Sequence, residues 1–295
     1  MAGDVLTFLR GHRLAVQASV SPAGAPQAAV VGYGVSDRLE IVFDTVDSTR
    51  KAQNLRRNSR IALTIGGLTA GDECTVQLEG VADEPAGAEL EALKQVYYAA
   101  YPDGPTRLSW PGLIYICVRP TWIRYSDYNA RPPEIIEFRE AAHADVDAMA
   151  EAHRDSIQSL GASFYSPEAV AAWQEGIGGQ LYLEAMDRDE VFFIATRSND
   201  VLGFASDYPI DGDKHGASAY VRGSAARHGI GSTLLCLAEA RARLRGARSV
   251  EIEASLAGVD FYRRHGFVEI GRGDSLLTTG EAIACVFMLK DLSPP

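Results

Sequence analysis

The sequence is poor in cysteine and has no paired metal-ligand motif. Its four cysteines, at positions 74, 117, 236 and 285, form no Cys-x-x-Cys pair, and its six histidines form no His-x-x-x-His pair. Zinc sites and disulfide frameworks use closer and more regular spacings, so we expect neither, and no other metal site. Unpaired cysteines are typical of a reducing compartment.

Long hydrophobic runs are also missing. The longest, Ala28–Val35 and Gly112–Val118, have the length of a strand, well short of the roughly 18 apolar residues that span a bilayer. The first residues, MAGDVLTFLRGHR, include Asp4 and lack a basic start followed by an apolar core, so no signal peptide is predicted. We therefore expect a cytoplasmic protein that has no membrane partner.

Positive charge is scarce, and lysine is especially rare. Four lysines and 24 arginines stand against 39 acidic residues, which gives a net charge of −11. When the chain is divided after Pro133, residues 1–133 carry −1 and residues 134–295 carry −10. This asymmetry, in a chain longer than most single domains, predicts two domains with these bounds. The acidic half disfavours nucleic acid and would suit a cationic or amine substrate.

The first half has the pattern of a small antiparallel barrel. Short runs rich in Val, Ile and Leu are separated by turn sequences such as SPAGAP and GGLTAGDE, and this pattern predicts strands. Two predicted helices, 49–58 and 88–100, interrupt them, and YNARPPE follows as a linker. The predicted strands are Leu14–Val20, Gln27–Tyr33, Leu39–Asp44, Ile61–Ile65, Thr75–Ala82, Ile114–Val118 and Trp122–Tyr125.

The second half alternates helices with strands, which predicts a mixed α/β sheet. Ser166 and Pro167 open one helix as its N-cap and first residue. The other predicted helices are Asp145–Leu160, Gly229–Arg245 and Gly258–His265. The predicted strands are Ile135–Arg139, Val191–Thr196, Val201–Ser206, Ser218–Val221, Val250–Ala254, Phe267–Ile270 and Ile283–Met288.

The strongest chemical signal is a glycine loop between a strand and a helix. Residues 219–235 read AYVRGSAARHGIGSTLL. Glycines let a ligand approach the backbone, and the helix N-terminus adds free N–H groups and partial positive charge, which suits a pyrophosphate. The loop lacks the Gly-Lys-Ser/Thr of a P-loop and the third glycine of a dinucleotide fingerprint. Residues 260–267 then read DFYRRHGF.

Together these two segments resemble the GNAT superfamily, the Gcn5-related N-acetyltransferases, over about Ile135–Lys290. The resemblance implies an α/β GNAT fold with a mixed central sheet, and acetyl-CoA as co-substrate. It makes Tyr262 the general acid that protonates the departing thiolate; the alternative is an aromatic packed in the core. The residues that it implies for acetyl-CoA, the first two through their backbone, are Tyr220, Val221, Arg227, His228, Gly229, Ile230, Gly231 and Ser232.

The chain departs from the GNAT pattern at Ala226, where the family usually has Arg or Gln. Arg222 and Arg227 are candidates to replace that side chain. Glu251 and Glu253, on one predicted strand, are candidates for the general base, with a water chain as the alternative. By the same resemblance, the acceptor amine would meet the stretch His153–Trp173, which includes Ser156 and Tyr165.

The first half carries a candidate phosphate site. Ser48-Thr49-Arg50-Lys51 follows a predicted strand and opens a short helix. Two hydroxyls, two cations and a helix N-terminus suit a phosphate monoester. The same residues are also typical of a solvated basic helix start.

With QAAVVGYG, LEIVFDT and TVQLEG around it, this segment resembles the pyridoxamine 5′-phosphate oxidase-like family, the FMN-binding split barrels, over residues 1–133. The resemblance implies an antiparallel split β-barrel (α+β), FMN or a deazaflavin as cofactor, and a homodimer. Gln27 stands near the place of a frequent arginine, and the segment after Trp122 does not match the end that binds vitamin B6 phosphate. The implied cofactor residues are Asp44, Thr45, Ser48, Thr49, Arg50, Lys51 and Gln77.

The two halves thus predict an acetyl-CoA-dependent N-acetyltransferase of a small amine, fused to a flavin-binding, oxidoreductase-like barrel. Two alternatives stay open. The barrel could serve only as a non-catalytic dimerisation or ligand-sensing module, or the chain could be an acyl-CoA-binding regulatory protein.

Overall fold

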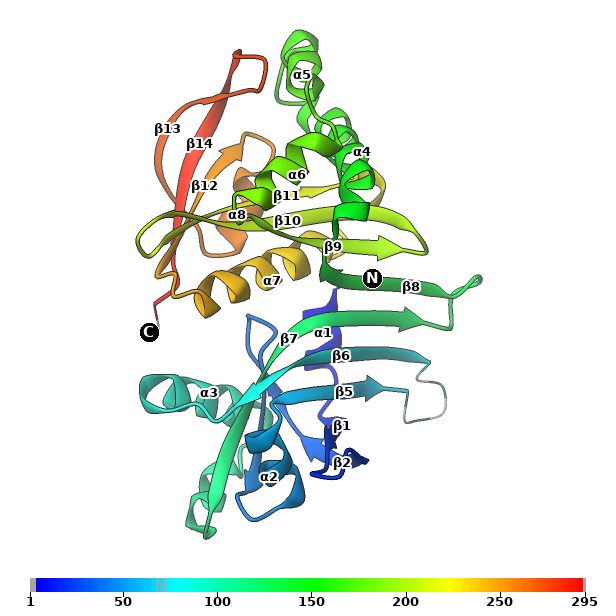
Figure 1. The fold of residues 1–295 in the computed structure, drawn as a ribbon, viewed down its shortest axis with the longest axis vertical. Helices are drawn as coiled ribbons and strands as arrows, with labels where there is room; N and C mark the ends of the chain where they lie inside the picture. Colours follow the sequence, from blue (N-terminus) through cyan, green and yellow to red (C-terminus); the bar gives the residue numbers. More distant parts are fainter. Residues whose placement is uncertain (1–3, 68, 70, 72, 294–295) are drawn as a thin grey trace. The chain divides into compact units, whose positions relative to one another are not determined.

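The computed structural model describes residues 4–67, 69, 71 and 73–293. The chain forms two compact units, which part between Glu137 and Phe138, inside strand β8 (Glu134–Glu140) (Figure 1). The turn expected at GGLTAGDE, residues 66–73, lies partly outside the described residues. Within the described ranges, no helix combines the length and the apolar character that a membrane crossing requires.

The N-terminal unit is a curled antiparallel sheet with helices around it. The strands follow the order β2-β1-β5-β6-β7-β4-β3, and every neighbouring pair is antiparallel. Because β2 also contacts β4, the sheet curls into a barrel, as predicted. Its elements are α1 (Val5–Arg10), β1 (Leu14–Val20), β2 (Pro26–Gly32), β3 (Gly34–Val35), β4 (Ile41–Val46), α2 (Arg50–Arg57), β5 (Arg60–Gly66), β6 (Cys74–Asp83), α3 (Gly87–Ala100), the 3-10 helix η1 (Gly104–Ser109) and β7 (Leu113–Asp127).

The prediction of two separate final strands was wrong, because β7 is one strand of 15 residues. Pro120 reads as a break in the sequence. In the structure, the register between β6 and β7 shifts beside Gly80, which pairs with Pro120. A Cβ on Gly80 would lie 2.3 Å from the carbonyl oxygen of Arg119, so glycine permits the close approach. A bulge of this kind accommodates a proline within a ladder.

The C-terminal unit is a mixed sheet covered by helices, also as predicted. From the edge strand β13 inward the order is β13-β14-β12-β11-β10-β9-β8, and β11 and β12 are the parallel pair. The elements after β8 are η2 (His143–Asp145), α4 (Val146–Ser156), the π-helix η3 (Ile157–Gly161), α5 (Pro167–Gln174), α6 (Gly179–Asp187), β9 (Val191–Arg197), β10 (Asp200–Asp211), β11 (Lys214–Val221), η4 (Gly223–Ala225), α7 (Ile230–Leu244), β12 (Ser249–Ser255), α8 (Val259–Arg264), β13 (Val268–Leu276) and β14 (Ala282–Asp291).

Local sequence signals explain several helix boundaries. The Ser166 hydroxyl accepts a hydrogen bond from the Ala169 N–H, at 3.2 Å, and Pro167 is the first helical residue of α5, which confirms the predicted cap. Asp4 caps α1 in the same way, through the Thr7 N–H at 3.0 Å. The sequence analysis missed both α1 and α6.

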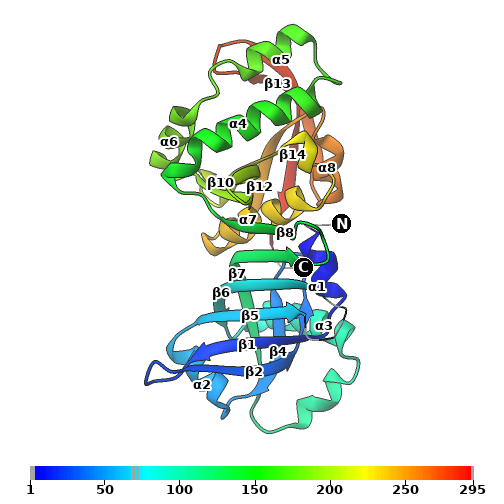
Figure 2. The ribbon, with the colours of Figure 1, turned by 90° about the vertical axis from the view of Figure 1, so that its right-hand side faces the viewer.

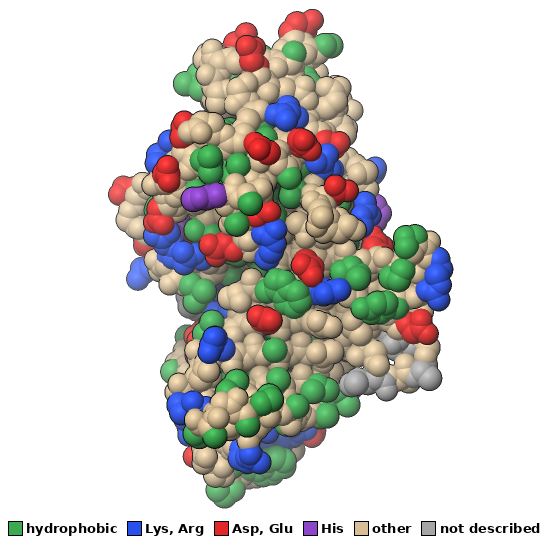
Figure 3. Space-filling model, turned by 45° about the vertical axis from the view of Figure 1, so that its right-hand side comes forward, with side chains coloured by type: hydrophobic (Ala, Val, Ile, Leu, Met, Phe, Trp, Pro, Cys, Tyr) green, Lys and Arg blue, Asp and Glu red, His purple; other side chains and the backbone are tan. Residues whose placement is uncertain are grey.

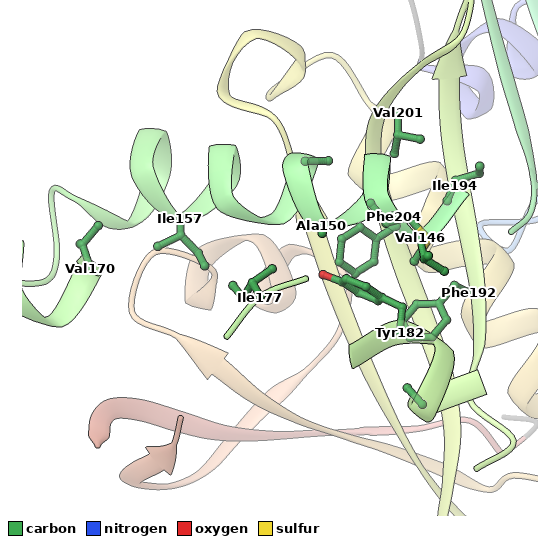
Figure 4. Packing of buried hydrophobic residues seen from close by; sticks show 13 residues of the cluster. Val146, Ala150, Ile157, Val170, Ile177, Tyr182, Phe192, Ile194, Val201 and Phe204 are labelled. Carbon is green, nitrogen blue, oxygen red and sulfur yellow. The ribbon is translucent and has the colours of Figure 1, made fainter. Parts of the chain in front are cut away.

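Two apolar cores lie on opposite faces of the C-terminal sheet. One packs α4 and α6 against β9 and β10, with Tyr182, Phe192 and Phe204 in edge-to-face contact (Figure 4). The other packs α7 and α8 against β12 and β14 around Leu235, Ile252 and other buried residues. The period-2 alternation of strands separates the two sets. Figure 2 shows α4 and α7 on the two sides of this sheet.

The excess negative charge of the second half does not form a single patch on the face in view. Figure 3 shows acidic and basic side chains interspersed on that face. Many of them pair locally, as Arg263 does with Glu269 and Lys290 with Glu239.

We expect Phe204→Ala to destabilise the C-terminal unit, because it opens a cavity where the ring packs against Tyr182 and Phe192. The free energy of unfolding should fall by about 3–5 kcal/mol. Phe164→Ala is the matched control, since that ring is 53% exposed, and it should change stability by less than about 0.5 kcal/mol. Hydrogen exchange of the α4 and β10 amides measures the loss of stability in each variant. Equal losses for Phe204→Ala and Phe164→Ala would contradict the assignment of Phe204 to the core.

Candidate functional site

The central feature of the C-terminal sheet is the point where two parallel strands diverge. β11 pairs with β12 at three positions only, the last of which joins Gly216 to Glu251. Beyond it, β11 continues along β10 as far as Val221, while β12 continues along β14 as far as Ser255. In the described part of the chain, no strand pairs with the β12-facing edge of Ala217–Val221. Tyr220 and Val221 lie on this stretch, where a ligand could pair with free backbone groups.

The glycine loop follows directly and leads into α7. Arg227 and Gly229 both adopt positive φ, 64° and 83°, and Gly229 is the N-cap of α7. Positive φ at alternate residues turns successive backbone N–H groups outward, and the first N–H groups of α7 have no partner within the helix. Arg227 and His228 are exposed, whereas the Ile230 side chain is buried, so Ile230 can offer only its backbone. Gly231 and Ser232 complete this first turn.

Arg227 is strained where it stands. A non-glycine residue in the left-handed region costs on the order of 1 kcal/mol, and such residues cluster at functional sites. Leu39, Asp189 and Ser198 adopt similar positive φ values in other turns of the chain.

An aspartate that the sequence analysis missed anchors the start of this loop. The Asp155 carboxylate, on α4, accepts a hydrogen bond from the Gly223 N–H at 2.8 Å. The Arg222 Nε donates to the carbonyl of Val201 at 2.7 Å, and its guanidinium faces Asp155 and Glu151. Arg222 is therefore committed to holding the loop, which leaves Arg227 as the candidate to replace the side chain missing at Ala226. No sequence pattern connects Asp155 with a glycine 68 residues away.

Tyr262 lies beside the diverging strands. It belongs to α8, is 5% exposed, and packs edge-on against Phe261 and Phe267. The backbone of Ala219, on the diverging stretch of β11, acts on the Tyr262 hydroxyl in the direction that lowers its pKa, which places the phenol beside that stretch. Burial, and next the neighbouring Tyr220, raise the pKa of Tyr262 well above its usual range. The phenol therefore stays protonated at neutral pH, as a proton donor must.

The two glutamates proposed as bases differ in their surroundings. Glu251 forms an ion pair with Lys214, at 3.0 Å from Oε1 to Nζ. Glu253 is exposed, and its charge acts on the phenols of Tyr208 and Tyr220. Of these two carboxylates, Glu251 is therefore engaged by a lysine, and Glu253 is the one whose negative charge raises the pKa of both phenols.

The stretch expected to meet the acceptor packs over the same face. The Tyr165 hydroxyl accepts from the Leu256 N–H and donates to the Ala284 carbonyl, both at 2.8 Å, so it ties this stretch to the ends of β12 and β14. Trp173 packs edge-on against Tyr165, while His153 and Ser156 are buried. A cleft of about 180 Å³ beside Tyr165 is lined by uncharged residues.

In the N-terminal unit, the expected phosphate residues gather at the start of α2. Thr49 caps this helix by accepting from the Ala52 N–H at 3.4 Å, and its hydroxyl lies 3.2 Å from that of Thr45. With the Gln27 amide oxygen turned toward it, the Arg50 guanidinium donates to Gln27, at 3.2 Å from Nε. The hydroxyl of Ser48 is exposed.

Lys51 is the group best placed for an anion in this cluster. Its ammonium makes no hydrogen bond or ion pair with any residue in the described ranges, and it lies in the first turn of α2, where an anion is favoured. Ser48 and Arg50, beside it in the sequence, add a hydroxyl and a second cation, and this chemistry suits a phosphate monoester such as that of FMN.

The two remaining flavin candidates are not part of this cluster. The Asp44 carboxylate accepts from the Tyr97 hydroxyl at 2.9 Å and from Arg107 at 3.1 Å, so it is already satisfied within the unit. Gln77 is exposed on β6, where it pairs with Thr64 and Arg124. A separate cleft of about 300 Å³ is lined by Lys94, Trp110 and Tyr115 among others, and by none of the flavin candidates.

Comparison with known proteins now identifies the two units. Residues 1–127 match the family model described as pyridoxamine 5′-phosphate oxidase, and residues 162–277 match the acetyltransferase (GNAT) domain. The chain therefore combines an N-terminal pyridoxamine 5′-phosphate oxidase-like domain with a C-terminal GNAT acetyltransferase domain. No curated protein matches the sequence.

Solved structures resemble one or the other half. A GCN5-related N-acetyltransferase from Rhodopseudomonas palustris is 28% identical over 52% of this chain and 94% of its own, with a TM-score of 0.47. The PaiA N-acetyltransferase from Thermoplasma acidophilum, solved in complex with coenzyme A, is 22% identical over 53% and 98%, with a TM-score of 0.44. A pyridoxamine 5′-phosphate oxidase-related, FMN-binding protein from Nostoc punctiforme is 14% identical over 43% and 80%, with a TM-score of 0.35.

Proposed function

We propose that the C-terminal domain transfers the acetyl group of acetyl-CoA to a small primary amine. The observation that carries this proposal is the divergence of β11 from β12 with Tyr262 beside it. In this proposal, the pantetheine arm pairs with the open edge of Ala217–Val221. The pyrophosphate binds the N–H groups of Arg227–Ser232 at the start of α7.

The proposed reaction needs one proton donor on the enzyme. The neutral amine attacks the thioester carbonyl, the C–N bond forms and the C–S bond breaks. Tyr262 gives its proton to the departing sulfur, and the proton that the amine loses returns to the Tyr262 oxygen through solvent. Glu253 borders this site as the candidate acceptor of that proton on its way out.

For the N-terminal domain we propose FMN as cofactor. Support comes from the Ser48–Lys51 cluster at the start of α2, which would hold the phosphate. When bound, a flavin supplies one- and two-electron redox chemistry. We further propose that a second copy of the chain pairs with the barrel, since Leu14 and Val30 on neighbouring strands are at least half exposed. A barrel that takes up no flavin would instead be a dimerisation or ligand-sensing module.

Changing Tyr262→Phe tests the proton donor. We expect kcat for acetyl transfer to fall by about 10²-fold or more, because the leaving thiolate loses its acid. The KM for acetyl-CoA should stay within about twofold, since removing a group that acts only in the transition state lowers kcat rather than binding. Tyr128→Phe, at an exposed tyrosine of the other unit, is the control. An unchanged kcat would make Tyr262 a core aromatic only.

Two glycines that flank α7 allow the effect of backbone strain on stability to be measured separately from the effect on ligand binding. Gly229 and Gly246 flank this helix with similar φ, 83° and 87°. Each Gly→Ala change should cost about 1 kcal/mol of stability, because alanine resists the left-handed region. Only Gly229→Ala should also weaken the binding of coenzyme A, measured by calorimetry. If both variants bound coenzyme A like the parent protein, the loop would not be the pyrophosphate site.

Replacing Lys51→Ala tests the flavin phosphate site. The Kd for FMN should rise by roughly 10–100-fold, the value of one charge-assisted contact. Binding of riboflavin, which lacks the phosphate, should not change. Lys94→Ala removes the same charge from a lysine that pairs with Glu91, and should leave both ligands unaffected. Equal losses for FMN and riboflavin would contradict the assignment.

A further inference from the structure

The N-terminal unit holds a cleft that neither of the two proposals uses. Its volume is about 300 Å³, at the lower end of the range that is typical of small-molecule sites. Three segments form it: the turn between β6 and α3, α3 itself, and the chain that leads from η1 into β7. We call it the α3 cleft, and we define it by the lining residues Glu84, Leu90, Lys94, Leu108, Trp110 and Tyr115.

One wall of the α3 cleft is apolar and partly exposed. Leu108 lies in η1 and Trp110 follows it, and the two residues are 54% and 52% exposed. The Arg107 guanidinium lies 5.9 Å from the centroid of the Trp110 ring, and Asp103 accepts from it at 2.7 Å. The indole therefore packs against a cation that is itself held in place. A flat indole beside a cleft offers a stacking surface to a planar ring.

Lys94 is the only cation among the described residues that line the α3 cleft. Only 16% of its side chain is exposed, and its ammonium lies 5.8 Å from the centroid of the Tyr115 ring. Within the described ranges, its one hydrogen-bond partner is Glu91, at 2.7 Å, whose side chain is 66% exposed. An ammonium has three N–H donors, and an ion pair with an exposed glutamate is weak. Lys94 can therefore bind a second carboxylate.

The other polar lining residues also suit an anion. Glu84 accepts two hydrogen bonds from Arg56, at 2.5 and 3.1 Å, so its negative charge is compensated. Tyr115 is 5% exposed, and its hydroxyl lies 3.2 Å from that of Tyr98. Burial raises the pKa of Tyr115 well above its usual range, so the phenol stays neutral and can donate a hydrogen bond.

We propose that the α3 cleft binds a small aromatic carboxylate. Its ring would lie against Trp110 and Leu108, and its carboxylate would pair with the Lys94 ammonium beside Tyr115. A cationic ligand would be repelled by Lys94, and a neutral one would leave the ammonium without a new partner. The cleft shares no residue with the Ser48–Lys51 cluster, so the inference is independent of both the FMN and the acetyl transfer proposed above.

Calorimetry on the full chain tests the charge of the ligand. It compares phenylacetate with phenylacetamide, which has the same ring and nearly the same shape but no charge. We expect the Kd of phenylacetate to be at least about tenfold lower, because a carboxylate forms a charge-assisted hydrogen bond with an ammonium. Equal affinities, or no binding of phenylacetate at millimolar concentration, would overturn the inference.

The variant Lys94→Met tests the lysine, since methionine keeps an apolar stem of similar length. The Kd of phenylacetate should rise by about tenfold, and that of phenylacetamide should stay within about twofold, because only the acid uses the ammonium. Lys214→Met is the matched control: that lysine also pairs with one glutamate, Glu251 at 3.0 Å, but lies in the other unit. Equal changes for the two ligands, or no change, would contradict a carboxylate at Lys94.

A second variant covers the case in which Lys94→Met fails to fold. Trp110→Leu replaces a half-exposed indole, and it should raise the Kd of both ligands by about three- to tenfold through the loss of ring stacking. Trp122→Leu, at a tryptophan of the same unit that does not line the cleft, should leave both Kd values as they are. Unchanged binding to the Trp110 variant would rule out the α3 cleft as the site.

A last comparison separates the α3 cleft from the proposed flavin site. The Kd of phenylacetate should be the same with and without saturating FMN, because no residue of the Ser48–Lys51 cluster lines the cleft. For the same reason, replacing Lys94 should leave the binding of FMN unaffected. Competition between FMN and phenylacetate would place both ligands in one site and overturn the inference.

Discussion

Three residue pairs hold β11 against β12, and the sheet opens where those pairs end. Everything proposed for the C-terminal domain depends on this opening. It frees one backbone edge of β11, lets the Tyr262 phenol lie beside Ala219, and leads the chain into the strained loop at the start of α7. β12 packs into the core on the α7 side, whereas β11 contributes Tyr220 to the α4 side and Ala217 to the α7 side.

The sequence carried enough local information for most elements of the fold. Period-2 runs located the strands of both units, and the Ser166–Pro167 signal located the start of α5. The glycine loop and Tyr262 were predicted from a local motif, and the structure places both beside the same opening. Local signals were weaker for β7, where Pro120 suggested a break. They were also weaker for α6, because its nine residues include few polar side chains to mark an exposed face.

The residues that lie together where the sheet opens could not be predicted as neighbours, because they come from separate strands. Gly216 pairs with Tyr208 of β10 on one side and with Glu251 of β12 on the other, and no sequence spacing connects the three. The role of Asp155 could not be predicted either, because its hydrogen-bond partner Gly223 lies far along the chain. In the barrel, the position of Ser48–Lys51 at the start of α2 was predictable because these residues form one continuous segment. The engagement of Asp44 by Arg107 and Tyr97 was not.

Hydrogen exchange across β11 tests most directly whether the open edge receives acetyl-CoA. Amides of Ala217–Val221 that face away from β10, and those that begin α7, should exchange more slowly when acetyl-CoA is saturating, because the ligand supplies the missing acceptors. Amides of β1 and β5, in the other unit, should not change. Exchange in β11 and α7 that is the same with and without acetyl-CoA would contradict the proposed site and the transfer chemistry that depends on it.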